Sequence, residues 1–200
     1  MDLSARLRRN GGRANVDAIV NWIGDNKVHF DALLSTLKKG DATTLQHGVW
    51  PMAYAAIAHP VFIKKHLTQL LKWLDESHHH DAVYRNVLKI FTEVDIPEKH
   101  AAALFDACIV FAKAEHRPVA IRAYALMILM NLVKRWPELQ HELTLIATEL
   151  LKLPQPPGVT ATLKKCLKSK WRNLLRPFQP LLERFLWAVL TRGLPPLNGE

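Results

Sequence analysis

Residues 117–136 read RPVAIRAYALMILMNLVKRW, and this stretch decides the fold. Pro118 stands where a helix begins, because its missing N–H costs nothing in a first helical turn. Between Ile121 and Val133 the only charged residue is Arg122, and apolar residues fall on every side of the helical wheel. A helix that is apolar all round has to be covered by neighbours on more than one side. The stretch therefore predicts a central helix in a layered all-α structure.

Similar stretches recur along the chain about every 40 residues. Residues 122–127 align with residues 47–52, 85–90 and 162–167, and each copy follows a short turn and another apolar helical pattern. A period of roughly 40 with two helices per unit is typical of HEAT-type α-solenoid repeats. We therefore predict an all-α, HEAT-like α-α superhelix of about four helix pairs with capping helices at both ends.

The predicted solenoid is a single domain over residues 1–200. Residues 1–14 are polar and basic, and we expect them to lack fixed structure. Prolines 177 and 180 end the last repeat, and residues 177–200 are predicted to form a C-terminal cap helix and tail.

Several runs also resemble a family of small bacterial HEAT-like proteins. The similarity covers roughly residues 14–175, and it is carried by NWIGDN (21–26), FDALL (30–34), HDAVYRNVL (80–88) and RPVAIRAY (117–124). The resemblance implies the same repeat fold, but the family has no established function, and some members carry an adenylosuccinate-lyase name. The chain departs from the family pattern at His47 and Thr162, where arginine is usual, and after Arg176. The Ser-rich loop and Lys-containing signature of the fumarase-superfamily lyases are absent, which argues against that name.

Composition indicates a soluble globular protein, with 49% hydrophobic and 22% charged residues. Cys108 and Cys166 form no CxxC motif or disulfide framework, which favours a reducing, cytoplasmic setting. The uncharged residues 42–63 hold Thr, Gln, Gly, His and Pro, so a membrane span is not expected there. Nucleotide-binding, hydrolase and zinc signatures are all missing, so no cofactor, no metal and no catalytic residue is predicted.

Basic charge gathers on the second helix of the predicted pairs. Residues 101–200 hold 14 basic and 7 acidic side chains, whereas residues 1–100 hold 13 and 11. The second helices carry a single acid, Glu93, against many cations. In HEAT solenoids these helices line the concave binding face. The candidate binding residues of this concave basic surface are therefore Arg85, Lys89, Arg122, Lys164, Lys168 and Arg172.

Each of these features also has a structural interpretation. Arg85 and Arg122 could form pairs between repeats, and the stripe at Lys164, Lys168 and Arg172 could simply face solvent. Trp50 and Trp171 lie on second helices, where they could stack a ligand or pack in the core.

The run His78-His79-His80-Asp81 offers imidazoles, but neighbouring side chains in a turn point in different directions. We interpret it as a polar turn with Asp81 near the N-terminus of the next helix.

Two functions follow from the predicted surface. The first is a non-enzymatic binding or scaffold module that presents a basic concave face to an acidic protein partner. The alternative is a nucleic-acid-binding protein resembling the DNA glycosylases built from HEAT-like repeats. Those enzymes use a concave-face carboxylate, and here only Glu93 is available, near a helix end. The sequence leaves the oligomeric state open.

Overall fold

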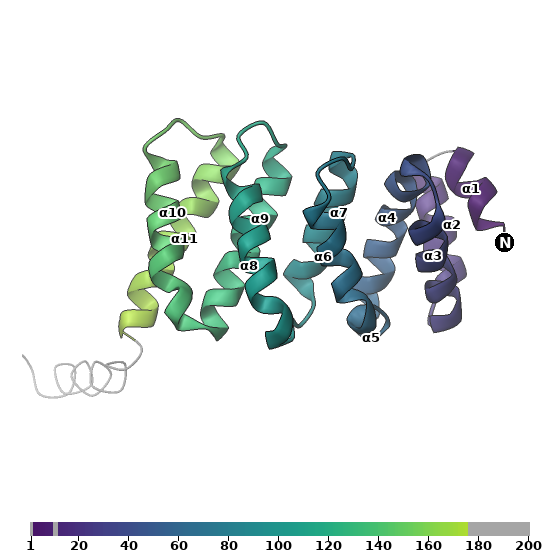
Figure 1. Cartoon of the computed structure of the whole chain (residues 1–200), viewed down its shortest axis with the longest axis horizontal. Coiled ribbons are helices and arrows are strands. Elements are labelled where there is room, and N and C mark those ends of the chain that lie inside the picture. The colour runs from purple at the N-terminus through teal and green to yellow at the C-terminus, as the bar shows by residue number, and fades with distance from the viewer. Residues whose placement is uncertain (1, 10–11, 176–200) are drawn as a thin grey trace, which may run out of the picture.

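The computed structural model describes residues 2–9 and 12–175, and within these ranges all regular structure is helical (Figure 1). Two short helices, α1 (Leu3–Arg9) and α2 (Arg13–Ile23), come first. Four pairs follow, and the first is α3 (Lys27–Lys39) with α4 (Ala42–Ala58). In the second pair, α5 (Pro60–Ile63), the 3-10 turn η1 (Lys64–His66) and α6 (Leu67–Asp75) together precede α7 (Asp81–Glu93). The third pair is α8 (Glu98–Lys113) with α9 (Val119–Arg135), and the fourth is the 3-10 turn η2 (Pro137–Leu139) and α10 (Gln140–Leu151) with α11 (Pro157–Leu175). The predicted all-α solenoid is confirmed. The predicted C-terminal cap lies outside the described residues.

The pairs stack side by side along the longest axis of the molecule (Figure 1). The second helices α4, α7, α9 and α11 pack one against the next, and we call them the second-helix row. The first helices run alongside them, with α6 against α8. One continuous hydrophobic cluster, from Leu3 to Cys166, fills the space between the helices. No described helix is long and apolar enough to cross a membrane.

The central helix α9 is covered on several sides, as its composition predicts. It packs against α8 of its own pair, against α7 before it and against α11 after it. Its buried positions cover slightly less than half of the helical wheel and include Ile121, Leu126, Leu129 and Val133. The other side of the helix is more open, and Met127 there is 39% exposed.

Local signals set where the helices begin and end. The side-chain oxygen of Asn26 accepts from the backbone N–H groups of Val28 and His29, which begins α3. Asp41 does the same for α4 through Thr44, and these hydrogen bonds lower the pKa of the Asp41 carboxyl.

The expectation that residues 1–14 lack fixed structure is wrong for α1. Leu3 and Leu7 are both buried, and Leu7 is fully enclosed between α1, α3 and α4. A Cβ on Gly48 of α4 would lie only 3.1 Å from a methyl group of Leu7 and 2.3 Å from one of Leu37. The missing side chain of Gly48 therefore makes room for α1, and two leucines one turn apart are enough to hold it.

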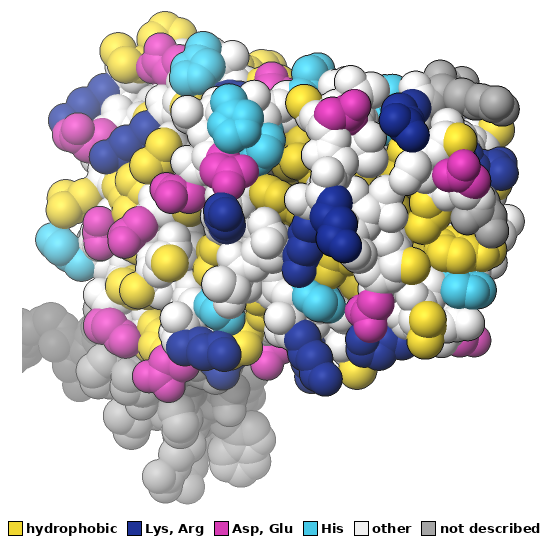
Figure 2. Space-filling model, turned by 45° about the vertical axis from the view of Figure 1, so that its right-hand side comes forward, with side chains coloured by type: hydrophobic (Ala, Val, Ile, Leu, Met, Phe, Trp, Pro, Cys, Tyr) yellow, Lys and Arg dark blue, Asp and Glu magenta, His cyan; other side chains and the backbone are white. Residues whose placement is uncertain are grey.

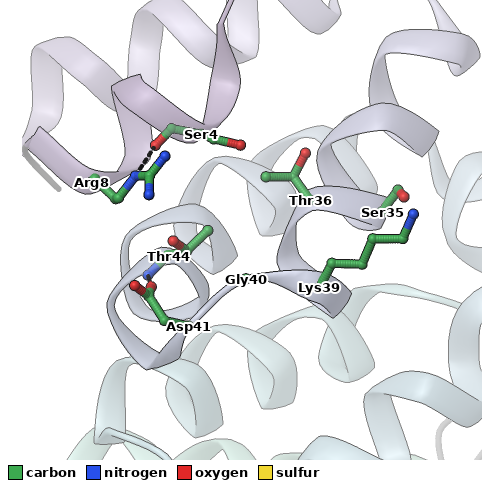
Figure 3. Close-up of a pocket in the computed structure, with 8 residues that line it drawn as sticks. All are labelled: Ser4, Arg8, Ser35, Thr36, Lys39, Gly40, Asp41 and Thr44. Atoms are coloured by element: carbon green, nitrogen blue, oxygen red, sulfur yellow. Dashed lines mark hydrogen bonds between the residues drawn. The ribbon is translucent and has the colours of Figure 1, made fainter.

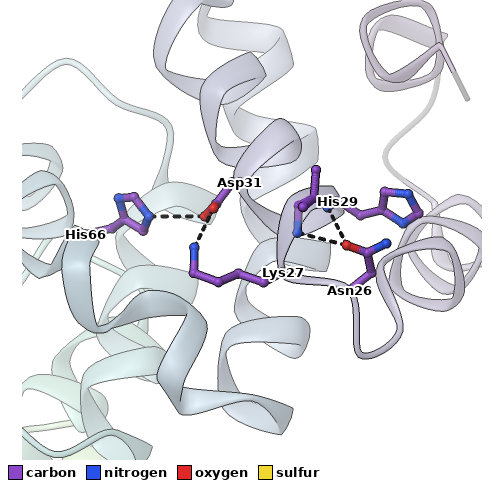
Figure 4. Close-up of polar contacts among 6 residues, drawn as sticks. Asn26, Lys27, His29, Asp31 and His66 are labelled. Carbon is purple, nitrogen blue, oxygen red and sulfur yellow. Dashed lines mark hydrogen bonds and ion pairs between the residues drawn. The ribbon is translucent and has the colours of Figure 1, made fainter.

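Polar contacts between residues 33–40 positions apart join neighbouring units of the array. The His47 ring bonds the carbonyl of Leu7 at 2.7 Å. His66 Nε2 lies 3.4 Å from Oδ1 of Asp31, and Lys27 donates to Oδ2 of the same carboxylate (Figure 4). Lys27 and then His66 lower the pKa of Asp31, so the carboxylate form is favoured in the folded chain. These contacts add polar interactions to the apolar packing between neighbouring units.

We expect Leu7→Ala to lower the free energy of unfolding by about 3 kcal/mol, because it opens a cavity where α1 meets α4. Leu153→Ala provides the control, since Leu153 is 56% exposed and its truncation should cost no more than about 0.5 kcal/mol. Urea unfolding followed by circular dichroism measures both. Equal stabilities of the two variants would contradict the placement of α1.

Candidate functional site

The open side of the second-helix row is the candidate site, and helical register shows which residues lie on it. The fully buried positions of α11 match those of α9 at a shift of 38 residues: Val159, Leu163 and Cys166 against Ile121, Ala125 and Ile128. The same shift relates α7 to α9, and it places Arg85 and Lys89 at the positions of Ala123 and Met127. Arg85 and Lys89 therefore lie on the open side.

Arg122 is not part of any exposed surface, which corrects its assignment as a binding residue. Its side chain is only 2% exposed, and burial lowers the pKa of the guanidinium. Nε donates to the carbonyl of Ala112 at 3.1 Å, and Nη2 donates to Oε1 of Gln155 at 2.7 Å. At a shift of 38 residues Arg122 corresponds to Tyr84, whose hydroxyl likewise donates back to the carbonyl of Glu76. The sequence alignment of these copies used a shift of 37 residues, which aligns Arg122 with Arg85 instead. A difference of one residue corresponds to a rotation of about 100° around the helix axis.

Two further arginines serve the contacts between repeats. Arg117 pairs with Asp81 at 2.6 Å and lies 4.5 Å from the centre of the Tyr84 ring. Arg135 pairs with Asp95 at 2.8 Å and also donates to the carbonyl of Ile96. Both guanidinium groups therefore form ion pairs between repeats.

Arg85 and Lys89 are placed differently, next to two aromatic rings of α4. The Lys89 ammonium lies 4.6 Å from the centre of the Tyr54 ring, and the Arg13 guanidinium of α2 lies 5.4 Å from the same ring. Trp50 lies one turn away, with its ring centre 6.5 Å from that of Tyr54. A hydrogen bond with Trp50, and then the charge of Lys89, lower the pKa of the Tyr54 phenol. We call Arg13, Trp50, Tyr54, Arg85 and Lys89 the cation–aromatic surface.

A groove of about 400 Å³ opens between α4 and α7 beside this surface. Its lining is formed by Gln46, His47, Trp50, His80, Ala82, Arg85 and Asn86. None of these described lining residues is acidic, and Arg85 has no hydrogen-bond or ion-pair partner among the residues that the structure describes. The groove therefore offers an uncompensated guanidinium beside an indole, an arrangement suited to a carboxylate next to an apolar group.

The last repeat adds lysines to the open side. At the shift of 38 residues, Lys165 and Lys168 correspond to Met127 and Met130 of α9. Lys164 corresponds instead to the buried Leu126. That side of the helix faces the following repeat, since Arg122, one turn earlier, reaches Gln155. The corresponding side of α11, the last described helix, is exposed at Lys164. Lys164 therefore lies on the end surface of the described array and not on the open side of the second-helix row. The side chain of Arg172 lies outside the described part, as does that of Trp171.

Charge elsewhere on the surface is mixed. Figure 2 shows a face on which basic and acidic side chains are interspersed. A second hollow, of about 460 Å³, lies between α1, α3 and α4 and brings Arg8 and Lys39 near hydroxyl groups of Ser4, Ser35 and Thr44 (Figure 3). The helix-capping carboxylate of Asp41 also faces this hollow. It is therefore less suited to an anion than the groove beside Arg85.

Sequence analysis identified Arg85, Lys89 and Trp50 but missed Arg13 and Tyr54. Tyr54 follows Trp50 by one helical turn, which was an available signal. Arg13 belongs to α2, and nothing local shows that α2 packs beside the open side of α4. The single candidate acid, Glu93, is exposed at the end of α7 and does not line the groove, so the site holds no groove-facing carboxylate among its described residues.

The comparisons with known proteins agree with this architecture. A family model described as a HEAT repeat domain matches residues 3–170. The match begins at α1 and ends within α11, so it spans all four helix pairs. In the comparisons with curated proteins and with solved structures, no match was found.

Two arginines on neighbouring second helices should respond differently to truncation. We expect Arg122→Ala to lower the free energy of unfolding by about 3 kcal/mol, because it leaves a void and takes the donor from the Ala112 carbonyl. The exposed Arg85→Ala should change it by no more than about 0.5 kcal/mol. Urea unfolding curves give both values, and a neutral Arg122→Ala would show that its two hydrogen bonds do not matter for stability.

Proposed function

The chain belongs to the HEAT-repeat family, and we propose that it is a non-enzymatic binding module whose cation–aromatic surface holds an acidic segment of a protein partner. HEAT arrays stack repeats into extended surfaces that bind other proteins. The observation that carries the proposal is the groove between α4 and α7, where the exposed Arg85 lies beside Trp50 with no acidic residue in the described lining.

The chemistry of the open side favours a particular kind of segment. Arg85 can form two parallel hydrogen bonds with one carboxylate, and Lys89 adds a second positive charge one turn along α7. Beyond them, α9 presents Ala123, Met127 and Met130, which are apolar and partly exposed. Methionine side chains adapt to partners of different shape. A segment with carboxylates on one side and apolar side chains on the other would satisfy both regions.

A binding experiment tests this proposal. The probe is a fluorescein-labelled, glutamate-rich synthetic peptide with leucines along one helical face, followed by fluorescence anisotropy. Arg85→Glu/Lys89→Glu should weaken binding at least about tenfold, which corresponds to about 1.4 kcal/mol, because attraction becomes repulsion. The matched control is Lys99→Glu/Lys113→Glu, which makes the same change in charge at exposed positions of α8.

Two outcomes would contradict the proposal. In the first, the control variant loses as much affinity as the α7 variant, so that only net charge matters. In the second, a peptide with glutamine in place of glutamate binds equally well. Circular dichroism of each variant shows whether it is folded.

The same assay distinguishes nucleic-acid binding. A labelled DNA duplex and a labelled RNA strand are titrated at several salt concentrations. Binding through phosphates weakens with a log–log slope of about −0.9 per neutralised phosphate of duplex DNA. Tight and steeply salt-dependent DNA or RNA binding that Arg85→Glu/Lys89→Glu abolishes, together with weak peptide binding, would replace the acidic protein partner with a polynucleotide.

A further inference from the structure

The turn between α6 and α7 holds three side chains of types that can bind a metal ion. One ligand atom each from Glu76, His78 and His79 lies within 4.8 Å of the other two. The Glu76 carboxylate and the His79 ring already touch, with Oε2 and Nε2 2.6 Å apart. The rings of His78 and His79 lie with their centres 4.4 Å apart. A carboxylate and two imidazoles therefore converge from four consecutive positions of the chain.

The surrounding hydrogen bonds hold this turn in shape. The Tyr84 hydroxyl donates to the carbonyl of Glu76 at 2.6 Å and accepts from the backbone N–H of His79 at 3.0 Å. One buried phenol thus fixes the main chain at both ends of the cluster. His79 itself is largely buried, with only 8% of its side chain exposed. Little conformational freedom is left to lose when a ligand binds.

His80 is not part of the cluster, although it is adjacent in sequence. Its Nδ1 accepts from the backbone N–H of Ala82 and so begins α7. Asp81 occupies the first turn of that helix and pairs with Arg117. The run 78–81 thus contains two histidines that lie together beside Glu76 and two residues that serve the start of α7.

We propose that Glu76, His78 and His79 bind a divalent transition-metal ion of the Zn²⁺ class. Two imidazoles and one carboxylate are a known three-residue ligand set for zinc, which leaves a fourth position for water or another ligand. Ligand atoms at about 2.1 Å from a tetrahedral ion are about 3.4 Å apart, so Oε2 and Nε2 separate slightly on binding. The ion takes the place of the hydrogen between these atoms, and the His79 ring then carries its proton on Nδ1.

Two cations lie near the site without excluding the ion. Lys72 is 3.9 Å from the other carboxylate oxygen of Glu76, but its side chain is 68% exposed and can turn into solvent. Arg117 lies over the Tyr84 ring and is paired with Asp81. The exposed imidazole of His78 and the partly exposed carboxylate of Glu76 give an ion access from solvent.

Isothermal titration of the untagged protein with ZnCl₂ tests the proposal, and visible absorption after Co²⁺ loading reports the coordination geometry. We expect one saturable site. His78→Ala and Glu76→Gln should each weaken Zn²⁺ binding at least about tenfold, as expected for the loss of a ligand. His78 is exposed, so its removal should leave folding intact. His141→Ala, at an exposed position of α10, is the control and should bind like the unmodified protein.

Three results would overturn the proposal. The unmodified protein could show no saturable binding, or His78→Ala and Glu76→Gln could both bind Zn²⁺ as well as it does. In the third, His80→Asn, which retains a capping side chain, would lose the ion while His78→Ala keeps it. Thermal unfolding with and without ZnCl₂ gives an independent readout: the ion should raise the Tm of the unmodified protein and not that of His78→Ala.

Discussion

The packing of each second helix against the next is the constraint on which the rest of the structure depends. α7 and α9 have apolar side chains toward the first helices and toward the repeats on both sides, so neither can bury its surface within one pair. Stability in such an array comes from the repeats and from the interfaces between neighbours. The open side of each second helix is then the part of its circumference that carries little packing constraint. Side chains on that side can therefore be replaced with little effect on the packing of the repeats, which leaves them free to bind a partner.

This constraint separates the cations of the chain into two groups. Arg117 and Arg122 lie toward a neighbouring repeat, where a guanidinium can reach carbonyl and side-chain oxygens that apolar residues would leave without a donor. Arg85 and Lys89 lie a fraction of a turn away and meet aromatic rings and solvent instead. Residue type does not separate these groups, and position within the repeat separates them only when the register is right to the residue. A shift of one residue turns the position by about 100° and moves a side chain from the interface to the open side.

The repeat fold could be predicted from the sequence because its signals are local and frequent. The uncharged apolar run of α9, the period near 40 and the prolines at helix starts all lie within a few residues of what they determine. The burial of Arg122 could not be predicted, because the copies can be aligned by sequence at a shift of 37 or of 38 residues, and the two shifts place Arg122 on different sides of the helix. The order of α1 was missed since only Leu3 and Leu7 signal it, and the space that admits them is made by Gly48, 41 positions after Leu7. Arg13 and Tyr54 meet only once α2 is packed on α4, and Glu76 joins His79 only through the shape of a turn.

Net charge is a poor guide to the surface of this chain, because its ion pairs cross from one half to the other. The C-terminal half holds twice as many basic as acidic residues, yet Arg117 and Arg135 find their carboxylates at Asp81 and Asp95, in the N-terminal half. Part of the excess positive charge of the C-terminal half is thus neutralised by acids of the N-terminal half. Those acids are then not available to pair with cations of their own half. Arg85, in the N-terminal half, is among the cations that form no ion pair with a described residue, and it lines the groove between α4 and α7. Electrostatic attraction at the open side therefore depends on which charges remain unpaired after the repeats have stacked, and not on the net charge of each half of the sequence.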